Sequence, residues 1–349
     1  MMRERLTYRI TMVFLYATVA LTVAILFFDR LPFHRERVEL GSMVYGAAHK
    51  PYAYRALVPG IVRAAAAAGD AALAPMGRTR ADSPLATFGA RLLADRGAPA
   101  DARQWSYEYG VLFVLTVASL IAFAWLLRAL TRGCHPEVPG FVSDIAPLLA
   151  LVVVPLVFFR QSNLVYDPMT LLLFTLGVYL IIRRSHVAFL ITFPLIALNK
   201  ETAILLVPLL LLHEAGRIGP TRLAALAAVP LASFAALRLW QAHALRARPG
   251  GLVEWHLEYN FAAFGDPGFY LKTLGAVLPL AVLVGSGWAR KSKFLRQGLL
   301  VTALPLVGAS LFLGVLGEMR DYYEAYPFVF LLAIPTAVEV FGVGRVTKA

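Results

Sequence analysis

Long apolar segments alternate with short polar connections along most of this chain. An α-helix needs roughly 20 apolar residues to cross a hydrocarbon core about 30 Å thick. Ten segments reach or approach this length, at 10–28, 107–130, 143–159, 164–182, 187–198, 203–213, 222–241, 271–289, 297–316 and 323–342. The pattern predicts an all-α, polytopic transmembrane helical bundle that forms a single domain over residues 1–349.

Two of the ten segments are short for complete membrane spans. Residues 187–198 and 203–213 are separated by the polar sequence Asn199-Lys200-Glu201-Thr202. Polar groups at membrane depth are tolerated only where protein or a water-filled cavity surrounds them. We therefore expect a short helical hairpin whose tip faces a polar site.

Two longer polar stretches interrupt the apolar pattern. Residues 29–106 form a long outer loop, in which the Ala-rich stretch 55–76 predicts a helix lying at the membrane interface. Residues 77–101 mix Pro, Gly, Asp and Arg, which indicates a surface excursion of modest order. A second outer loop, 242–270, carries an aromatic group suited to the interface or to stacking on a sugar.

The basic residues orient the bundle. The chain is 59% hydrophobic and 15% charged, with a net charge of +12. Its Lys and Arg gather in alternate connections, at 3–9, 128–132, 183–184, 217–222, 290–296 and 345–348. By the positive-inside rule both termini are cytoplasmic, and we expect an integral protein of the bacterial cytoplasmic (inner) membrane. Topology and contact with anionic membrane lipids account for the charge, so it does not predict nucleic-acid binding.

The cysteine and histidine residues predict neither a disulfide nor a metal site. The single cysteine, Cys134, allows no intramolecular disulfide. The histidines form neither an HExxH motif nor a close pair, so we expect no metal site built from them. No cofactor is predicted, and a requirement for a divalent metal is left open.

Polar residues concentrate on the outer side of the predicted topology. The groups are Asp29-Arg30, Tyr52-Ala53-Tyr54-Arg55, Arg160-Gln161 with Tyr166-Asp167, Asn199-Lys200-Glu201, and the run from Glu318 to Glu324. Such a concentration near a membrane is costly unless it lines a wet cavity or performs a task. We therefore predict a functional site on this side.

Each acid and base of the first groups has two interpretations. Asp29 is either a helix-end acid or a general base toward an acceptor hydroxyl. Arg55 either anchors lipid headgroups or contacts a phosphate, for which a guanidinium is well suited. Asp167 precedes Pro168 at a helix start, where an acid is an ordinary cap, although it also lies in the predicted substrate site.

The remaining candidates favour a functional role. Lys200 lies between two apolar helices and would hold a lipid phosphate, and Glu201 would orient it or bind the acceptor. Asn199 belongs to the same tip. Arg320, between Glu318 and Tyr322, suits a pyrophosphate or sugar site, although the run is also consistent with a polar turn.

This arrangement resembles the GT-C superfamily of polytopic glycosyltransferases, which includes mannosyl-, arabinosyl- and aminoarabinosyl-transferases that use polyprenyl-phosphate sugars. The resemblance rests on layout: Asp29 after the first helix, the long outer loop, Tyr166-Asp167-Pro168, Asn199-Lys200-Glu201-Thr202, and Glu318-Met319-Arg320 leading to Tyr326-Pro327. It implies that Asp29 is the catalytic base and that Lys200, Arg320 and Arg55 bind the donor phosphate. Many members carry two adjacent acids in the first loop, whereas Arg30 follows Asp29 here.

The expected function is transfer of a sugar from a polyprenyl-phosphate donor to an acceptor hydroxyl on the extracytoplasmic side. A carrier or flippase for a lipid-linked or small polar substrate is the main alternative, but it requires polar residues in the middle of several helices. The centres of 143–159, 271–289 and 297–316 contain no acid or base. A polysaccharide polymerase and a purely structural subunit are further alternatives. The single long loop of small residues disfavours the first, and the Lys200-Glu201 pair disfavours the second.

Overall fold

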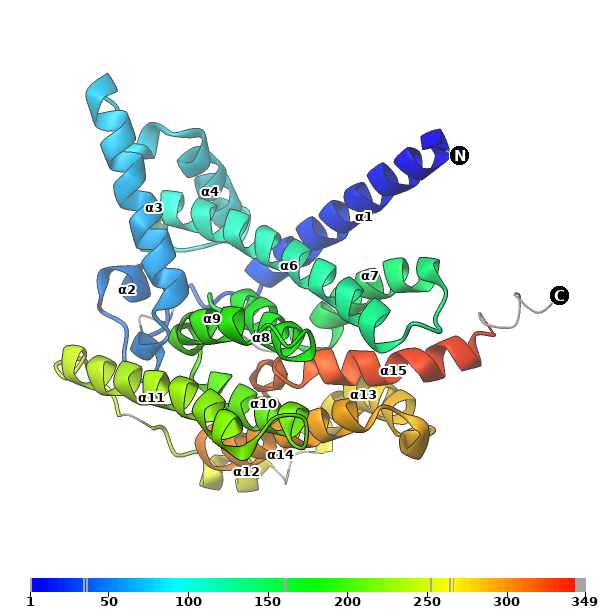
Figure 1. Cartoon of the computed structure of the whole chain (residues 1–349). Helices are drawn as coiled ribbons and strands as arrows, with labels where there is room; N and C mark the ends of the chain where they lie inside the picture. Colours follow the sequence, from blue (N-terminus) through cyan, green and yellow to red (C-terminus); the bar gives the residue numbers. More distant parts are fainter. Residues whose placement is uncertain are drawn as a thin grey trace.

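The computed structural model describes residues 2–33, 35, 37–159, 162–251, 253–263, 265 and 267–342. Within these ranges the chain forms α- and 3-10 helices and no strand, which confirms the all-α prediction (Figure 1). The α-helices are α1 (Met2–Phe28), α2 (Leu40–Tyr45), α3 (Leu57–Leu73), α4 (Pro84–Ala94), α5 (Ala100–Arg103), α6 (Ser106–Cys134), α7 (Gly140–Val157), α8 (Asp167–Ile182), α9 (His186–Asn199), α10 (Leu206–Glu214), α11 (Pro220–Ala244), α12 (Leu257–Ala263), α13 (Pro267–Gly285), α14 (Lys293–Leu313) and α15 (Tyr326–Val340). The 3-10 helices are η1 (Tyr52–Tyr54), η2 (Ala74–Met76), η3 (Arg80–Asp82), η4 (Glu201–Leu205), η5 (Trp288–Arg290) and η6 (Met319–Tyr322).

Six stretches of helix among the described residues are long and apolar enough to cross a membrane. They belong to α1, α3 (with η2), α6, α7, α11 and α14, whereas α8, α9 and α15 are apolar but shorter. Several side chains on these helices and on α13 are unusually exposed for their type, with Phe14, Leu239 and Leu271 at 70% or more. Such surfaces indicate contact with lipid and an integral membrane protein.

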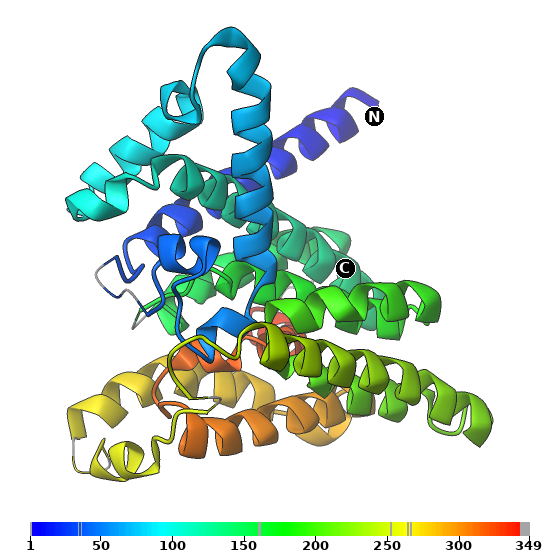
Figure 2. The same cartoon turned by 90° about the vertical axis from the view of Figure 1, so that its left-hand side faces the viewer.

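The long helix α6 is the centre of the packing. It contacts α1, α3, α4, α7, α8 and α15, while α13 and α14 pack against α15. The axis of α3 is steeply inclined to the axes of α9 and α11 in both views (Figures 1 and 2). This helix lies within the predicted range 55–76, and it projects away from α9 and α11.

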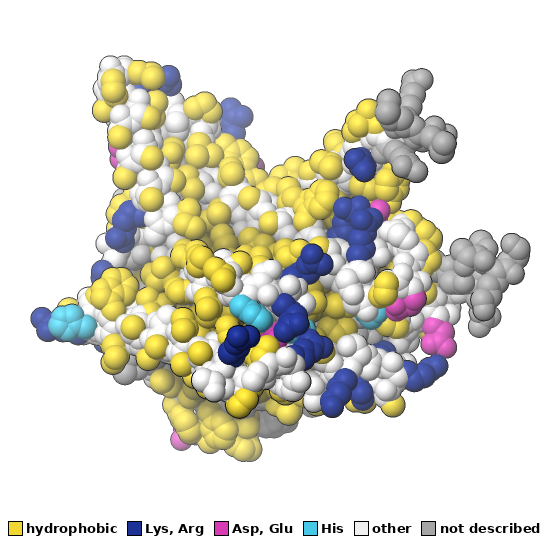
Figure 3. All heavy atoms as spheres, in the orientation of Figure 1, with side chains coloured by type: hydrophobic (Ala, Val, Ile, Leu, Met, Phe, Trp, Pro, Cys, Tyr) yellow, Lys and Arg dark blue, Asp and Glu magenta, His cyan; other side chains and the backbone are white. Residues whose placement is uncertain are grey.

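One carboxylate ties three helices together near the start of α1. Asp144 of α7, almost fully buried, accepts hydrogen bonds from Arg128 Nε at 2.5 Å, Arg132 Nη2 at 2.6 Å and the Tyr8 hydroxyl at 2.7 Å. The start of α1 and the end of α15 lie on the same side of the molecule (Figure 1). Lys and Arg side chains gather toward this side on the face drawn in Figure 3, and hydrophobic side chains dominate the rest.

Residues 77–101 are more regular than the sequence predicted. They contain α4, which packs along α6 at two glycines. A Cβ at Gly89 would lie 1.9 Å from the Ser106 carbonyl oxygen, and one at Gly110 would lie 2.5 Å from that of Leu85. The prediction of an excursion of modest order is wrong, because glycines on both helices allow the backbones to approach closely.

The second long loop is anchored by one asparagine. Asn260 of α12 is buried and donates from Nδ2 to the carbonyl oxygens of Ser310, Leu311 and Gly314, at 2.8 to 3.0 Å. Its Oδ1 accepts from the Leu316 N–H at 2.9 Å. These bonds satisfy backbone groups at the end of α14, where the last carbonyl groups have no hydrogen-bond partner within the helix.

The short helices α9 and α10 are joined by η4 as the sequence predicted, but they do not form a paired hairpin. Each packs against α8 and α11 rather than along the other. A hairpin would bury the two helices on one another. Instead, the packing of α9 and α10 on α8 and α11 holds the polar segment 199–202 in place.

We predict that Gly110→Ala destabilises the protein by about 1–3 kcal/mol, as expected for overpacking at a tight contact. Gly133→Ala is the matched control, because Gly133 lies in the same helix and a Cβ there would meet no neighbouring atom within 4 Å. Thermal unfolding in detergent would show a lower midpoint for Gly110→Ala alone. Equal midpoints for the two variants would contradict the close α4–α6 contact.

Candidate functional site

Four segments that are distant in sequence meet at the end of the bundle opposite the start of α1. They are the residue after η1, the start of α8, the α9–η4 junction and the link from α14 to α15. They bring together a set of mainly charged residues, which we call the charged cluster: Arg55, Tyr166, Asp167, Lys200, Glu201, Glu318, Arg320 and Glu324.

Arg55 and Glu201 form a two-point ion pair. Arg55 Nη2 lies 2.7 Å from Glu201 Oε1, and Nε lies 3.3 Å from Oε2. The guanidinium also donates to the Tyr166 hydroxyl and sits 4.7 Å from the centre of that ring. Burial opposes ionisation of Glu201, but the nearby Arg55 charge outweighs it and lowers the Glu201 pKa to about 2. The Arg55 charge therefore favours the ionised form of Glu201.

Lys200 and Glu324 form the most deeply buried pair of the charged cluster. Lys200 Nζ lies 3.1 Å from Glu324 Oε1, and the two side chains are 6% and 0% exposed. Thr202 donates a hydrogen bond to the same oxygen. Glu324 Oε2 is buried and has no hydrogen-bond partner within the described part of the chain. Losing either partner would leave an uncompensated charge in the interior.

Arg320 has its own carboxylate within the same turn. Its Nε donates to Glu318 Oε2 at 3.0 Å, and the two side chains are mostly buried. Burial alone would lower the Arg320 pKa, but Glu318 and Asp321 outweigh it and raise that pKa. Tyr322 directs its hydroxyl to the Leu316 carbonyl oxygen at 3.4 Å, and burial raises its pKa. The charge of Arg320 is thus compensated within the predicted polar turn.

Asp167 lies among these three cations. It is 1% exposed, and its electrostatic neighbours are Arg320, Lys200 and Arg55. Helix α8 begins at Asp167 as predicted, but the carboxylate accepts from the preceding Leu164 N–H at 2.8 Å. The interpretation of Asp167 as a cap for α8 is wrong, because its oxygen is directed backward along the chain.

Asn199 joins the α9–η4 junction to the start of α8. It is 1% exposed and donates from Nδ2 to Thr170 Oγ1 at 2.8 Å. A longer bond of 3.4 Å reaches the Tyr166 carbonyl oxygen. These contacts fix Lys200 and Glu201 relative to Asp167. Asn199 is therefore a positioning residue of the charged cluster.

Asp29 lies on a neighbouring segment and has a different partner. Its Oδ1 lies 2.9 Å from Arg96 Nε, and its side chain is 43% exposed. The end of α1 is linked to the loop before α8 because Asn163 N–H donates to the Arg30 carbonyl oxygen at 2.9 Å. Among the described residues, Asp29 pairs with Arg96 and not with the charged cluster. Arg160, also predicted in the site, lies outside the described residues.

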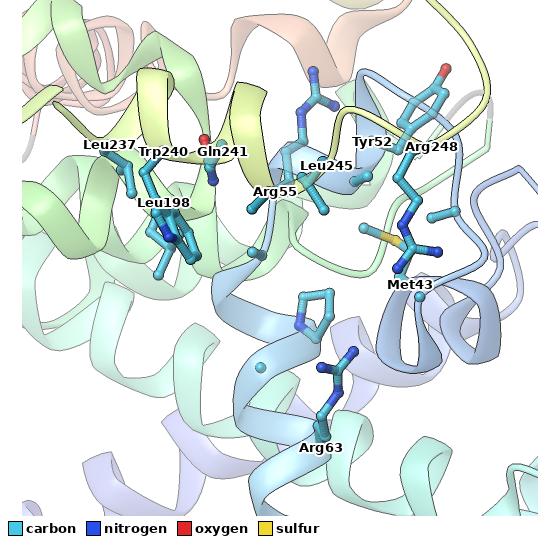
Figure 4. Close-up of a pocket in the computed structure, with 17 residues that line it drawn as sticks. Met43, Tyr52, Arg55, Arg63, Leu198, Leu237, Trp240, Gln241, Leu245 and Arg248 are labelled. Atoms are coloured by element: carbon cyan, nitrogen blue, oxygen red, sulfur yellow. The ribbon is translucent and has the colours of Figure 1, made fainter. Parts of the chain in front are cut away.

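A cavity of about 410 Å³ lies beside the charged cluster, between α2, α3 and α11 (Figure 4). Its walls are largely apolar, and three arginines line it. We call it the arginine groove, and its labelled walls in Figure 4 include Met43, Tyr52, Leu198, Leu237, Trp240, Gln241 and Leu245, together with Arg55, Arg63 and Arg248.

The cations of the arginine groove differ in their partners. Arg55 is held by Glu201, whereas Arg63 donates from Nε to the Val44 carbonyl oxygen at 2.6 Å. Neither Arg63 nor Arg248 has a carboxylate partner among the described residues, and no acid lines the groove. The groove therefore offers uncompensated positive charge next to apolar surface.

Sequence reasoning missed both of these arginines. Arg63 interrupts the Ala-rich helix at 55–76, which is a usable signal for a functional side chain. Arg248 lies in the second loop, far from Arg63 in sequence, and no local pattern distinguishes it from other loop arginines. Within the described residues, no group of three or more His, Cys, Asp or Glu side chains is placed to hold a metal.

Comparisons of this chain with protein-family models, curated proteins and solved structures find no match. Functional conclusions therefore rest on the charged cluster and the arginine groove.

We predict that Glu324→Gln lowers the stability of the protein by about 3–5 kcal/mol, because Lys200 is left buried and unpaired. Glu339→Gln is the control, since Glu339 and Arg290 lie 3.9 Å apart and are 66% and 77% exposed. Thermal midpoints measured in the same detergent would fall for Glu324→Gln and stay unchanged for Glu339→Gln. An unchanged midpoint for both would mean that the buried pair does not support the fold.

Proposed function

We propose that this protein is a membrane glycosyltransferase that moves a sugar from a polyprenyl-phosphate donor to an acceptor hydroxyl. The observation that carries the proposal is the position of Arg55, which lines the arginine groove and also pairs with Glu201 of the charged cluster. A lipid-linked sugar has the same sequence of parts: an apolar chain, an anionic phosphate and a polar sugar. The groove and the cluster offer complementary surfaces in that order.

The arginine groove suits the lipid and the phosphate. Leu198, Leu237 and Trp240 provide apolar contact for a prenyl chain. Arg63 and Arg248 have no carboxylate partner among the described residues, and guanidinium groups bind phosphate oxygens with strong, charge-assisted hydrogen bonds. These two residues therefore replace Lys200 and Arg320 as the main phosphate ligands in our proposal.

Lys200 and Arg320 take a different role. Their pairs with Glu324 and Glu318 neutralise them and hold the carboxylates in fixed positions. A site of fixed carboxylates and a tyrosine, positioned by Asn199, provides hydrogen-bond partners for sugar hydroxyls. We assign the charged cluster to the sugar of the donor, with Glu201 nearest to the phosphate because it shares Arg55.

The chemical step is a displacement at the anomeric carbon. The acceptor oxygen forms a bond to this carbon, and the bond from the carbon to the phosphate oxygen breaks. Polyprenyl phosphate leaves with the electron pair, and the acceptor proton passes to Asp29, whose side chain is 43% exposed. The groove arginines stabilise the charge that develops on the leaving phosphate, which is usually a large contribution to catalysis.

We place this site on the extracytoplasmic side of a bacterial cytoplasmic membrane, with both termini cytoplasmic and ten membrane segments. The basic residues near the start of α1, including Arg128 and Arg132, support this orientation. The steep crossing of α3 over α9 and α11 supports an interfacial position for α3 (Figures 1 and 2). The segment 199–202 is then a polar connection at the site.

The test is release of polyprenyl phosphate by purified protein in lipid, given a panel of polyprenyl-phosphate sugars. We predict that Arg248→Gln raises the donor KM roughly tenfold or more, because a charge-assisted contact is lost.

Asp29→Asn is expected to lower kcat by about 10²–10⁴-fold. Arg246→Gln, an exposed neighbour that does not line the groove, should leave both constants unchanged.

Two outcomes would overturn the proposal. The first is no release from any donor while labelled lipid or solute still crosses the bilayer, which would indicate a carrier. The second is release that is unaffected by both Arg248→Gln and Asp29→Asn, which would place the chemistry elsewhere.

A further inference from the structure

A second cavity lies away from the arginine groove, in the long loop before α6. It has a volume of about 660 Å³ and lies between α4, the η3 turn and the start of α6. This volume is within the roughly 300–1,000 Å³ that is usual for small-molecule sites. We call it the α4 cavity, and its main polar walls are Arg80, Arg91, Arg103, Gln104, Tyr107 and Glu108.

The walls of the α4 cavity are unlike those of the arginine groove. Its aliphatic lining consists of alanines, such as Ala86, Ala90 and Ala94, and it includes no Leu, Ile, Val, Met, Phe or Trp among the described residues. It therefore lacks the large aliphatic side chains that line the arginine groove. Arginine, amide and hydroxyl groups supply its hydrogen-bonding partners, as in sites for polar and water-soluble ligands.

The charges of the α4 cavity are unequally compensated. Arg80 is held by Glu108 at 3.2 Å and by Asp70 at 3.3 Å, so its charge is neutralised inside the protein. Within the described ranges, Arg91 and Arg103 have no carboxylate partner although they line the same cavity. Two uncompensated guanidinium groups on one cavity favour an anionic ligand.

We propose that the α4 cavity binds an anionic saccharide that carries carboxylate or phosphate groups. Arg91 and Arg103 contact the anionic groups, while Gln104 and the hydroxyls of Thr87 and Ser106 bond to sugar hydroxyls. The unneutralised charge sets the preference for an acidic sugar, and the lack of large aliphatic side chains in the described lining sets the preference for a soluble one.

This saccharide is also the acceptor, an assignment that rests on the proposed transferase function. Helix α4 ends at Ala94, and Arg96 in the following turn is the residue that pairs with Asp29. The helix that borders the α4 cavity therefore leads directly to the partner of the proposed catalytic base. The binding itself does not depend on the transfer reaction.

The experiment measures saccharide affinity for the full-length protein in nanodiscs of phosphatidylcholine. The probes are a uronic-acid oligosaccharide, a neutral oligosaccharide of the same length, and glycerol phosphate, each titrated at low and at physiological salt. We expect the acidic oligosaccharide to bind at least tenfold more tightly than the neutral one, and high salt to weaken it. Glycerol phosphate should compete with it.

The double variant Arg91→Gln/Arg103→Gln is expected to lose at least tenfold in affinity for the acidic oligosaccharide. Both side chains are exposed, so the variant should keep the thermal midpoint of the parent, which is measured in parallel. Arg78→Gln, in the same loop but outside the cavity, is the control and should bind as the parent does.

Three results would overturn the proposal. They are equal affinity for acidic and neutral oligosaccharides, unchanged affinity in the double variant, and an affinity for the acidic oligosaccharide that high salt does not weaken. Saccharide binding without release of polyprenyl phosphate from any donor would instead overturn the proposed function and leave the cavity assignment standing. The two proposals therefore fail separately.

Discussion

The ion pair between Lys200 and Glu324 is the contact on which the candidate site depends. It joins the α9–η4 junction to the segment before α15 in an interior where unpaired charge is costly. The next residue, Glu201, reaches in another direction to Arg55. The adjacent residues Lys200 and Glu201 thus fix the positions of two other segments, the link from α14 to α15 and the residue after η1. Losing these two pairs would remove the main polar connection between the ends of these segments.

The arginines of the ion pairs and those of the two cavities differ in their partners. Arg55, Arg128 and Arg320 have carboxylate partners and fix the positions of segments. Arg248 and Arg91 line cavities and have no carboxylate partner among the described residues. The same side chain therefore serves as internal support in one setting and as a proposed ligand contact in the other. The presence or absence of a neighbouring acid is what distinguishes the two.

Much of the fold could be predicted from the sequence, because helix length and apolar content are local properties. Each of the ten apolar segments coincides with a helix, and the unusual placement of Lys200 and Glu201 between apolar runs indicated a site. Their partners were not predictable. Glu324 and Arg55 lie more than a hundred residues away from them, and nothing local to either residue specifies the pairing.

The errors have physical causes of the same kind. Residues 77–101 were expected to form an excursion of modest order, yet Gly89 and Gly110 permit the close contact of α4 and α6. The partner of Asp29 was likewise not predictable, since Arg96 lies in the segment that was expected to be of modest order. Long-range contacts decided each case, and local pattern alone could not supply them.

The shared guanidinium of Arg55 has a thermodynamic consequence. Any anion that binds the groove beside Arg55 interacts with the same positive charge that favours the ionised form of Glu201. Occupancy of the groove and proton binding at Glu201 are therefore linked, and reciprocity requires that each alters the other by the same factor. An anion that leaves the groove returns the full charge of Arg55 to Glu201. The departure of one anion thereby resets the electrostatic state of the site for the next.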